Sequence, residues 1–450
     1  MATVRDLLSQ IDGMVEEIVR THQDLIRIPS VNTGTMPTGN ETPVAKHVAD
    51  WLAKDGIKSE ILESAPGRGS IIARMEGASG KAGLMLMSHL DVVPVEDESK
   101  WSVPPFGGML KNGRVYGRGA SDCKSLLTAQ MFAMRTLKRS GVKLKEGLIL
   151  ASGADEEHGG RYGFGWIAKH HPEKIMAKYA VNEGGGYPTE TAAGTAYVMN
   201  LGEKGRLQVE LTIKGTSAHA SMPWTGTNAL FKLAQVLQRI EAYEPVRDTS
   251  AEMFKSLSLF AIEDKPSPEN IDSIVSELEK TNKSMSIFLK AASRMTFTPT
   301  MIRGGIKSNS VPESIRLTCD VRTLPFQDDK YVRKEIEKCL EGIDGVDIDI
   351  DYMAVPTDSP YGTKFTDEIK KATIQALGRD DLQWIPGLCV GFTDSRFTRE
   401  LGIQTYDFAG THPDDDPLAC KVHGTDESEG VASLVSSTKV MLALAHNMLV

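Results

Sequence analysis

The chain has 450 residues, of which 40% are hydrophobic and 25% are charged, as in an ordinary soluble globular protein. That length exceeds what one compact core usually serves, so the sequence predicts two domains. The net charge of -9 at pH 7 excludes the basic surface that displaces counterions from nucleic acid, and we expect no nucleic-acid partner.

The N-terminal segment is predicted to form an amphipathic surface helix. Its apolar residues Leu8, Ile11, Val15, Ile18 and Val19 share one helical face, and acidic residues interrupt the segment. This pattern is typical neither of a secretory signal nor of a membrane anchor, so we expect no membrane partner.

The five cysteines are scattered and odd in number, and no two of them form a CxxC pair. This usage is typical of free thiols in a reducing compartment and predicts a cytoplasmic protein. Cys123 stands beside Asp122, where it could meet a metal ion, but a small packed hydrophobe is the favoured interpretation.

The first 200 residues alternate apolar strands with helical patterns. Residues 69–77, 83–91 and 146–155 have the composition of buried strands, and residues 125–140 have helical periodicity. Such alternation predicts an α/β fold in which helices cover a central sheet. Helix and strand patterning resumes after Pro356 and continues to the C-terminus, which predicts that this last part completes the sheet.

A second pattern begins near Gly205. Its predicted elements follow the order β-α-β-β-α-β, which is the ferredoxin-like order. They are residues 206–215, 227–245, 297–305, 313–323, 330–343 and 346–355. The sequence therefore predicts a catalytic domain of residues 1–204 and 356–450, into which a second domain, residues 205–355, is inserted. An extra charged and helical segment, about residues 247–295, lies inside the second domain, and the sequence gives it no chemistry.

Five polar side chains follow apolar stretches in glycine-rich turns. They are His89, Asp91, Asp122, Glu156 and Glu157. Because an open α/β sheet keeps its ligand where strands give way to loops, we expect these side chains to cluster. Imidazole and carboxylates without thiolate suit zinc or a similar divalent ion in a hydrolytic site. Taken singly, each acid could equally be a solvated loop carboxylate.

Two competing motifs fail on inspection. The run GASDCKS ends like a phosphate loop, but Cys123 stands where the glycine before the lysine is required. The run DIDIDY begins like a calcium loop, but Tyr352 occupies the position of the required glycine. Its alternating apolar residues predict a half-buried strand instead.

Five short motifs occur in order along the chain. They are SHLDVVP, GRGASDCKS, DEEHGG, VNEGGG and KVHGTDE. In this order they resemble the dizinc family of aminoacylase, acetylornithine deacetylase, succinyl-diaminopimelate desuccinylase and carboxypeptidase G. The resemblance covers nearly the whole chain, because TSAHAS and SNSVPESIRLTCDVR are similar to the lid of that family. It implies a zinc-peptidase-like α/β catalytic domain with an inserted ferredoxin-like α+β lid or dimerisation domain.

The resemblance also implies two Zn²⁺ ions per subunit, for which Co²⁺ or Mn²⁺ can substitute. His89 and Glu183 would bind one ion. Glu157 and His423 would bind the other, and Asp122 would bridge the two. Each ion would keep an open position for a shared water, which is a catalytic arrangement, since structural zinc sites are closed.

Two further acids are given roles by the same resemblance. Glu156 matches the non-ligand acid of the family and would act as the general base, taking a proton from the water and passing it to the departing amine. Asp91 would accept the other imidazole N–H of His89 and fix the tautomer of the ring.

Substrate contacts are expected from both domains. His219, in the lid motif, would reach the active site of the partner subunit, which implies a homodimer. Asn309 and Arg322 would contact a substrate carboxylate, for which a guanidinium group is well suited, and Arg396 is a further candidate. Taken alone, His219 could be a loop residue, Arg322 a surface strand charge and Arg396 an ion-pair partner at a helix start.

The predicted function is zinc-dependent hydrolysis of the amide bond in a small N-acyl amino acid or peptide with a free carboxylate. Glutamate at position 183, where the aminopeptidase members tend to carry aspartate, favours deacylase or carboxypeptidase activity. The acyl group stays open. A dipeptidase of the same family and a non-catalytic zinc-binding regulatory homologue are the alternatives, and the presence of all five ligands together with Glu156 argues against the second.

Overall fold

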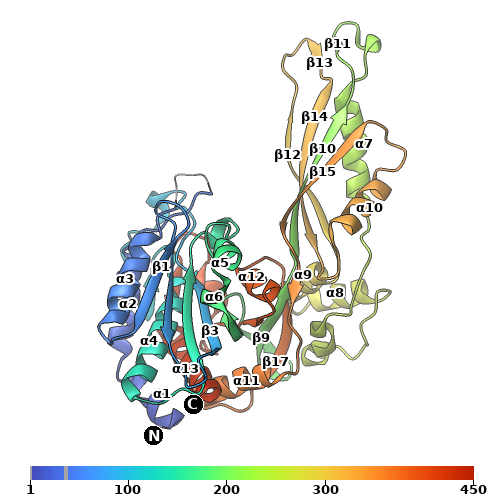
Figure 1. Ribbon diagram of the computed structural model, residues 1–450. Helices are drawn as coiled ribbons and strands as arrows, with labels where there is room; N and C mark the ends of the chain where they lie inside the picture. The colour runs from blue at the N-terminus through green and yellow to red at the C-terminus, as the bar shows by residue number, and fades with distance from the viewer. Residues whose placement is uncertain (1–2, 35–38) are drawn as a thin grey trace. The chain divides into compact units, whose positions relative to one another are not determined.

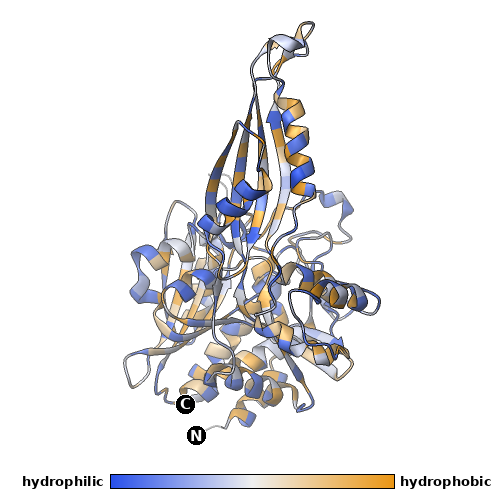
Figure 2. Cartoon of the chain, turned by 90° about the vertical axis from the view of Figure 1, so that its right-hand side faces the viewer, coloured by the Kyte–Doolittle hydropathy of each residue, from blue (hydrophilic) through white to orange (hydrophobic). Residues whose placement is uncertain are grey.

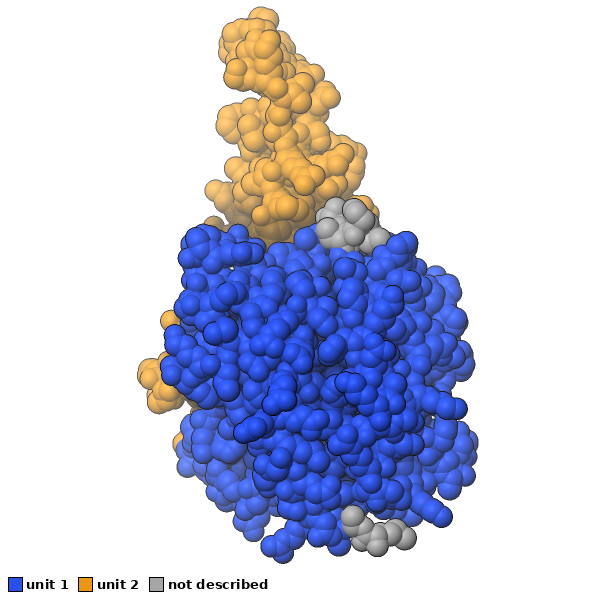
Figure 3. All heavy atoms as spheres, turned by 90° about the vertical axis from the view of Figure 1, so that its left-hand side faces the viewer, with its two compact units in different colours: residues 1–201, 359–387, 393–450 blue, residues 202–358, 388–392 orange. Residues whose placement is uncertain are grey.

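Two compact units make up the chain in a computed structural model that describes residues 3–34 and 39–450. Unit 1 comprises Met1–Leu201, Ser359–Gly387 and Thr393–Val450, and unit 2 comprises Gly202–Asp358 and Leu388–Phe392 (Figures 1 and 3). Unit 2 is thus inserted in the sequence of unit 1. The role of the inserted residues 205–355 as a lid or dimerisation domain stays a prediction.

The N-terminal segment forms two helices, so the prediction of a single helix was wrong. Helix α1 (Val4–Asp12) ends at Gly13, and α2 (Val15–Ile26) begins two residues later. Glycine carries a high entropic cost inside a helix, which explains the break at this position. The amphipathic pattern itself is confirmed, because Leu8 in α1 and Ile18 in α2 are buried.

The central sheet has the strand order β1-β2-β6-β3-β7-β18-β9-β16, with β8 and β17 also paired to β9, and all of its strands from β1 to β18 in this order belong to unit 1. Strands β6, β3, β7 and β18 run parallel, whereas β1 and β2 are antiparallel to their neighbours. The strands are β1 (Lys58–Glu63), β2 (Gly69–Met75), β3 (Ala82–His89), β6 (Gly147–Gly153), β7 (Ala177–Asn182), β8 (Pro188–Thr191), β9 (Gly194–Glu203), β17 (Gln383–Cys389) and β18 (Gln404–Asp407).

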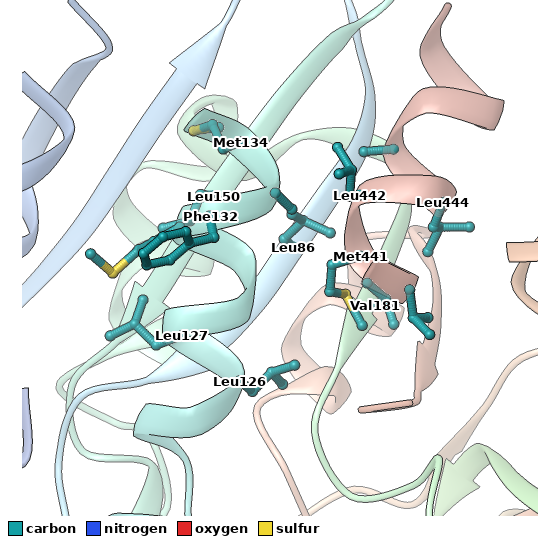
Figure 4. Close-up of a cluster of buried hydrophobic side chains, with 14 of the residues drawn as sticks. Leu86, Leu126, Leu127, Phe132, Met134, Leu150, Val181, Met441, Leu442 and Leu444 are labelled. Carbon is teal, nitrogen blue, oxygen red and sulfur yellow. The ribbon is translucent and has the colours of Figure 1, made fainter. Parts of the chain in front are cut away.

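Helices cover both faces of this sheet, as expected for parallel strands. Leu86 of β3 packs in the cluster that includes residues of α4 (Lys124–Ser140) and α13 (Val431–Leu449), whereas its neighbour Met87 packs with Phe164 on the other face. Figure 4 shows Leu86 among side chains of α4 and α13. Because successive side chains of a strand point to opposite faces of the sheet, β3 contributes to two separate cores.

Further elements complete unit 1. Its other helices are α3 (Thr42–Ala53), α5 (Phe164–His170), α6 (Pro172–Ile175), α11 (Lys364–Leu377) and α12 (Ser395–Glu400). A small antiparallel sheet joins β4 (Met109–Lys111), β5 (Arg114–Tyr116) and β19 (Ser428–Gly430). The mixed α/β fold with a central sheet and flanking helices agrees with the predicted fold class.

Unit 2 is built around a four-stranded antiparallel sheet of order β12-β14-β10-β15. The bounds are β10 (Gly205–Lys214), α7 (Ala229–Glu241), β12 (Thr296–Gly304), β14 (Ser314–Thr323), α10 (Asp329–Cys339) and β15 (Val346–Ala354). These elements follow the predicted β-α-β-β-α-β order. Figure 2 shows hydrophilic and hydrophobic residues alternating along the strands, because one face packs on the helices and the other does not.

The extra segment of unit 2 has a small core of its own. It contains α8 (Ile271–Glu279) and α9 (Lys283–Ala292), which pack with Phe254 and Leu257 in one buried cluster. Three short strands remain in this unit. They are β11 (Ala218–His219), β13 (Ser310–Val311) and β16 (Thr357–Asp358).

The first prediction concerns the core under the central sheet. Leu86→Ala removes a fully buried side chain between α4 and α13, so we expect the free energy of unfolding to fall by about 2 to 5 kcal/mol. Urea titration followed by circular dichroism measures the change. Leu110→Ala is the control, because Leu110 is 51% exposed and its truncation should cost at most about 0.5 kcal/mol. Equal effects of the two variants would contradict this packing.

Candidate metal centre

The predicted ligands gather at one edge of the central sheet of unit 1. His89 is the last residue of β3, and Glu183 directly follows β7. Glu156 and Glu157 lie in a short 3-10 turn three residues after β6. Because β3, β6 and β7 are parallel neighbours, their carboxyl ends lie side by side, and His89 pairs in register with Gly153. Asp122 immediately precedes the residue that caps α4, at the same place.

Asp122 lies between two histidines. Its Oδ1 is 2.8 Å from Nε2 of His89, and its Oδ2 is 3.0 Å from Nε2 of His423. Glu183 Oε1 lies 3.4 Å from the same nitrogen of His89. Glu157 Oε2 lies 3.0 Å from Nε2 of His423. The side chains therefore form two groups that share the Asp122 carboxylate.

The carboxylates of the cluster are crowded together and largely removed from water. Burial raises the pKa of Glu156 well above its ordinary value, and the neighbouring Glu183 charge adds to the effect. Burial, followed by the charge of Asp122, raises the pKa of Glu157 to about 7. Hydrogen bonds to Asp122 and Glu157 raise the pKa of His423 to about 10. These shifts show that the acids outnumber the positive charges available to them, which is the condition that a bound cation relieves.

Asp91 is buried behind His89, but it contacts more than the imidazole. The His89 Nδ1 atom is 3.0 Å from the Asp91 backbone carbonyl and 3.4 Å from its carboxylate. The two carboxylate oxygens accept the backbone N–H groups of Glu156 and Glu157, each at 3.1 Å. Asp91 thus fixes the turn that carries both glutamates as well as the histidine ring.

Asp155 stabilises the same turn, which it directly precedes in the sequence. It has a φ of 66°, the left-handed region that non-glycine residues seldom adopt. Its carboxylate accepts hydrogen bonds from Arg68 at 2.7 Å, Asn32 at 3.1 Å and the Tyr162 backbone at 3.0 Å. These contacts hold a strained residue directly before the two glutamates.

Glu427 is a residue that sequence reasoning missed. One oxygen accepts the backbone N–H groups of Ser121 and Asp122 at 3.0 and 3.1 Å, and the other accepts from Arg118 at 2.6 Å. The side chain is fully buried. Glu427 therefore fixes the backbone of the shared carboxylate. Glu427 is the last residue of the KVHGTDE motif, so its place beside the candidate ligand His423 could have marked it as a site residue. The sequence alone, however, does not distinguish a buried acid at this position from a solvated one.

Two residues near the cluster make hydrogen bonds to the protein backbone. Cys123 is buried, its Sγ accepts the His89 backbone N–H at 3.2 Å, and burial raises the pKa of the thiol. Arg396 is 2% exposed and donates to the carbonyls of Thr393 and Gly159, each at 2.7 Å. The structure therefore places the Arg396 guanidinium among backbone carbonyls of unit 1.

The predicted contacts of unit 2 lie at two ends of its sheet. His219 is exposed and pairs with Ser310 across β11 and β13, and the Asn309 carbonyl accepts the N–H of Ala220. Arg322 lies eight residues beyond Ser314 along β14, about 26 Å away at about 3.3 Å per residue. The structure thus brings His219 and Asn309 together and keeps Arg322 apart from them.

The chain belongs to the peptidase family M20/M25/M40, whose family model matches residues 85–447. It is accordingly a metal-dependent hydrolase of amide or peptide bonds. None of the helices within residues 3–34 and 39–450 combines the length and apolar character that crossing a bilayer requires.

Individual relatives resemble the chain over most of its length. A Staphylococcus aureus protein named Probable succinyl-diaminopimelate desuccinylase is 26% identical over 388 residues, which cover 84% of this chain and 85% of the relative. The crystal structure of an M20 family metallo-carboxypeptidase from Sulfolobus solfataricus has a TM-score of 0.72 at 22% identity and covers 95% of this chain and 98% of its own. The structure of human carnosine dipeptidase 1 has a TM-score of 0.70 at 16% identity and covers 100% and 99%. The two structures share the fold.

The second prediction tests the support of Asp122. Glu427→Ala leaves the buried Arg118 without its carboxylate and two backbone amides without an acceptor, so we expect a loss of about 3 to 5 kcal/mol in unfolding free energy. Glu427→Gln should lose less, because its amide oxygen can still accept both N–H groups. Thermal unfolding compares the two with Glu98→Ala, an exposed control. A Glu427→Ala protein as stable as that control would contradict the assigned contacts.

Proposed function

We propose that the chain is a dizinc hydrolase that cleaves the amide bond of N-acyl amino acids or small peptides bearing a free carboxylate. The placement of Asp122 carries the proposal. One of its oxygens faces His89 and the other faces His423, with one glutamate beside each histidine. A carboxylate presented in this way suits two ions that share one bridging ligand.

The donor atoms fit divalent metal ions. Ligand atoms of His89, Asp122 and Glu157 lie within 4.8 Å of one another, and those of His89, Cys123 and Glu183 form an overlapping group. Imidazole and carboxylate ligands favour zinc, and Co²⁺ or Mn²⁺ can substitute at such a site. We assign Cys123 no ligand role, because burial raises its pKa and opposes the thiolate that metals bind.

The proposed reaction depends on the metal ions and on Glu156, which have different roles. When bound, two ions lower the pKa of the attacking water and polarise the substrate carbonyl. Glu156 takes the proton from that water and passes it to the departing amine, and it sits 8% exposed beside the ligand Glu157. Asp91 acts through others, since its contacts orient His89 and the Glu156–Glu157 turn.

The third prediction separates the two adjacent glutamates. Glu156→Ala should lower kcat by about 100- to 10,000-fold and keep its metal, because a proton shuttle is lost and no ligand is removed. Glu157→Ala should lose metal, as measured by elemental analysis after dialysis. Glu190→Ala, an exposed acid of unit 1, is the control for charge. A fully active Glu156→Ala enzyme would refute the role of Glu156 as general base. Activity that survives exhaustive treatment with chelator would refute the requirement for metal ions.

We also infer a homodimer, from the positions of the predicted substrate contacts at the two ends of the unit 2 sheet. Within one chain, Asn309 and Arg322 are too far apart to hold the same carboxylate, so we infer that His219 and Asn309 serve the active site of the partner subunit. Apolar side chains near β11 and β13 support an interface at this end. They are Met222, Trp224, Phe231 and Ile306, which are 51%, 80%, 74% and 96% exposed.

The fourth prediction tests this exchange of residues. His219→Ala and Glu156→Ala homodimers should each be nearly inactive. Mixing them under conditions that exchange subunits gives half mixed dimers, each with one intact site of two, so about 25% of wild-type activity should return. Native mass spectrometry verifies the exchange. If exchanged mixtures stay inactive, His219 works within its own subunit or only supports a loop.

We also infer a cytoplasmic location. None of the five cysteines forms a disulfide, and four of them are buried. Cysteines in this number without a disulfide suit a reducing compartment.

A further inference from the structure

Two arginines stand directly opposite each other on the sheet of unit 2. Arg206 of β10 pairs in register with Arg322 of β14. Successive side chains of a strand alternate between the faces of the sheet, and the neighbours Leu207 and Val321 pack in the core. Both arginines therefore project from the face that does not pack on the helices. Like charges placed opposite each other on paired strands repel, so this pair requires an anion nearby.

Asp320 supplies part of that negative charge and also fixes the two guanidinium groups. Its Oδ2 accepts the Nε–H of Arg206 at 3.2 Å, and its Oδ1 accepts the Nε–H of Arg322 at 2.8 Å. Two positive charges beside one negative charge leave one positive charge without a counterion. A single carboxylate would neutralise it.

Phe392 lies against the same two groups. The Cζ atoms of Arg206 and Arg322 are 5.6 and 5.8 Å from the centre of its ring, within the range of a cation–π contact. The ring limits how the guanidinium groups can turn, and Asp320 fixes their Nε atoms. Side chains ordered in this way lose less conformational entropy when they bind a ligand.

The outer ends of both guanidinium groups keep their donors. Among the residues that the structure describes, no protein acceptor forms a hydrogen bond with Nη1 or Nη2 of Arg206 or Arg322. The two side chains are 33% and 24% exposed, so a small solute can reach them. The paired N–H groups of a guanidinium match the two oxygens of a carboxylate.

We propose that Arg206 and Arg322 together bind the free carboxylate of the substrate, and that Arg206 determines the preference for substrates that carry one. The inference rests on the proposed amide hydrolysis, which acts on such substrates. The sequence motifs predict this contact for Arg322 alone. Asp320 and Phe392 are positioning residues, because they act through the two arginines.

A purely structural role for the pair makes a different prediction. In that role the arginines only attach the segment that ends at Phe392 to the sheet. One arginine over the ring is enough for this purpose, and a second arginine opposite the first adds repulsion. A structural role also does not distinguish a substrate with a carboxylate from one without it, which is the basis of the experiment.

The experiment compares a free carboxylate with its carboxamide. The substrates are the N-acyl amino acid or dipeptide that the metal-loaded enzyme hydrolyses fastest and the same compound with an amidated C-terminus. For the wild type we expect kcat/KM for the acid to exceed that for the amide by about 100-fold, because two arginines make charge-assisted contacts. Arg206→Gln should reduce this preference by about tenfold, chiefly through KM, and leave the rate on the amide nearly unchanged.

Two further variants are the controls. Arg206→Lys keeps the charge without the paired donors, so it should restore part of the preference. Arg316→Gln removes an arginine that is 62% exposed on the same strand and face, and it should leave the preference unchanged. An Arg206→Gln enzyme that keeps the wild-type preference, or that loses equally on acid and amide, would overturn the inference. Equal rates of the wild type on acid and amide would also overturn it, while amide hydrolysis itself would stand.

A binding measurement decides the inference if neither compound is hydrolysed, in which case the proposed function fails. The probe is methanesulfonate, which carries one negative charge and is a poor ligand for metal ions. Titration of the metal-loaded protein, followed by nuclear magnetic resonance, should give a Kd of about 1 to 10 mM. The Kd should rise about tenfold in Arg206→Gln and stay unchanged in Arg316→Gln. No binding to the wild type at about 50 mM, or equal binding to wild type and Arg206→Gln, would overturn the inference.

Discussion

The whole site depends on the parallel register of β6, β3 and β7. Because these strands pair in the same direction, the residues that follow each of them emerge at one edge of the sheet, and His89, Glu183 and the Glu156–Glu157 turn meet there. Asp122 lies with these three glutamates, and four acids in one buried place would repel one another in isolation. The sheet can present them only because its two separate cores, one on each face, fix the strands beneath them.

Around this cluster, buried polar contacts set the positions of backbone atoms as much as those of side chains. Asp91 holds the amides of the glutamate turn, Glu427 holds the amide of Asp122, and Asp155 keeps a left-handed conformation supported by Arg68. A carboxylate that accepts two backbone N–H groups fixes a loop more firmly than one that meets a single side chain. The geometry of the site therefore depends on buried acids that fix the backbone around the candidate ligands.

Much of the fold could be predicted because its strands and helices carry strong periodic patterns, as in β3, α4 and β10. The strand-end ligands could be predicted for a related reason, since polar residues directly after apolar runs mark the edge of a sheet. The break at Gly13 was missed because apolar periodicity continues across it. Distances within unit 2 could not be predicted either. Asn309 and Arg322 are close in sequence, but the extended strand β14 separates them.

The strand order also has a consequence for how the protein is made. Strand β18 lies between β7 and β9, and the helix α13 that packs against α4 forms the last part of the chain. Both are synthesised after all of unit 2, so unit 2 is complete while unit 1 still lacks an internal strand, a core helix and His423. Domains generally fold in the order in which they leave the ribosome. The inserted unit can therefore fold before unit 1 is complete, and the metal centre receives His423 only after unit 2 has been synthesised.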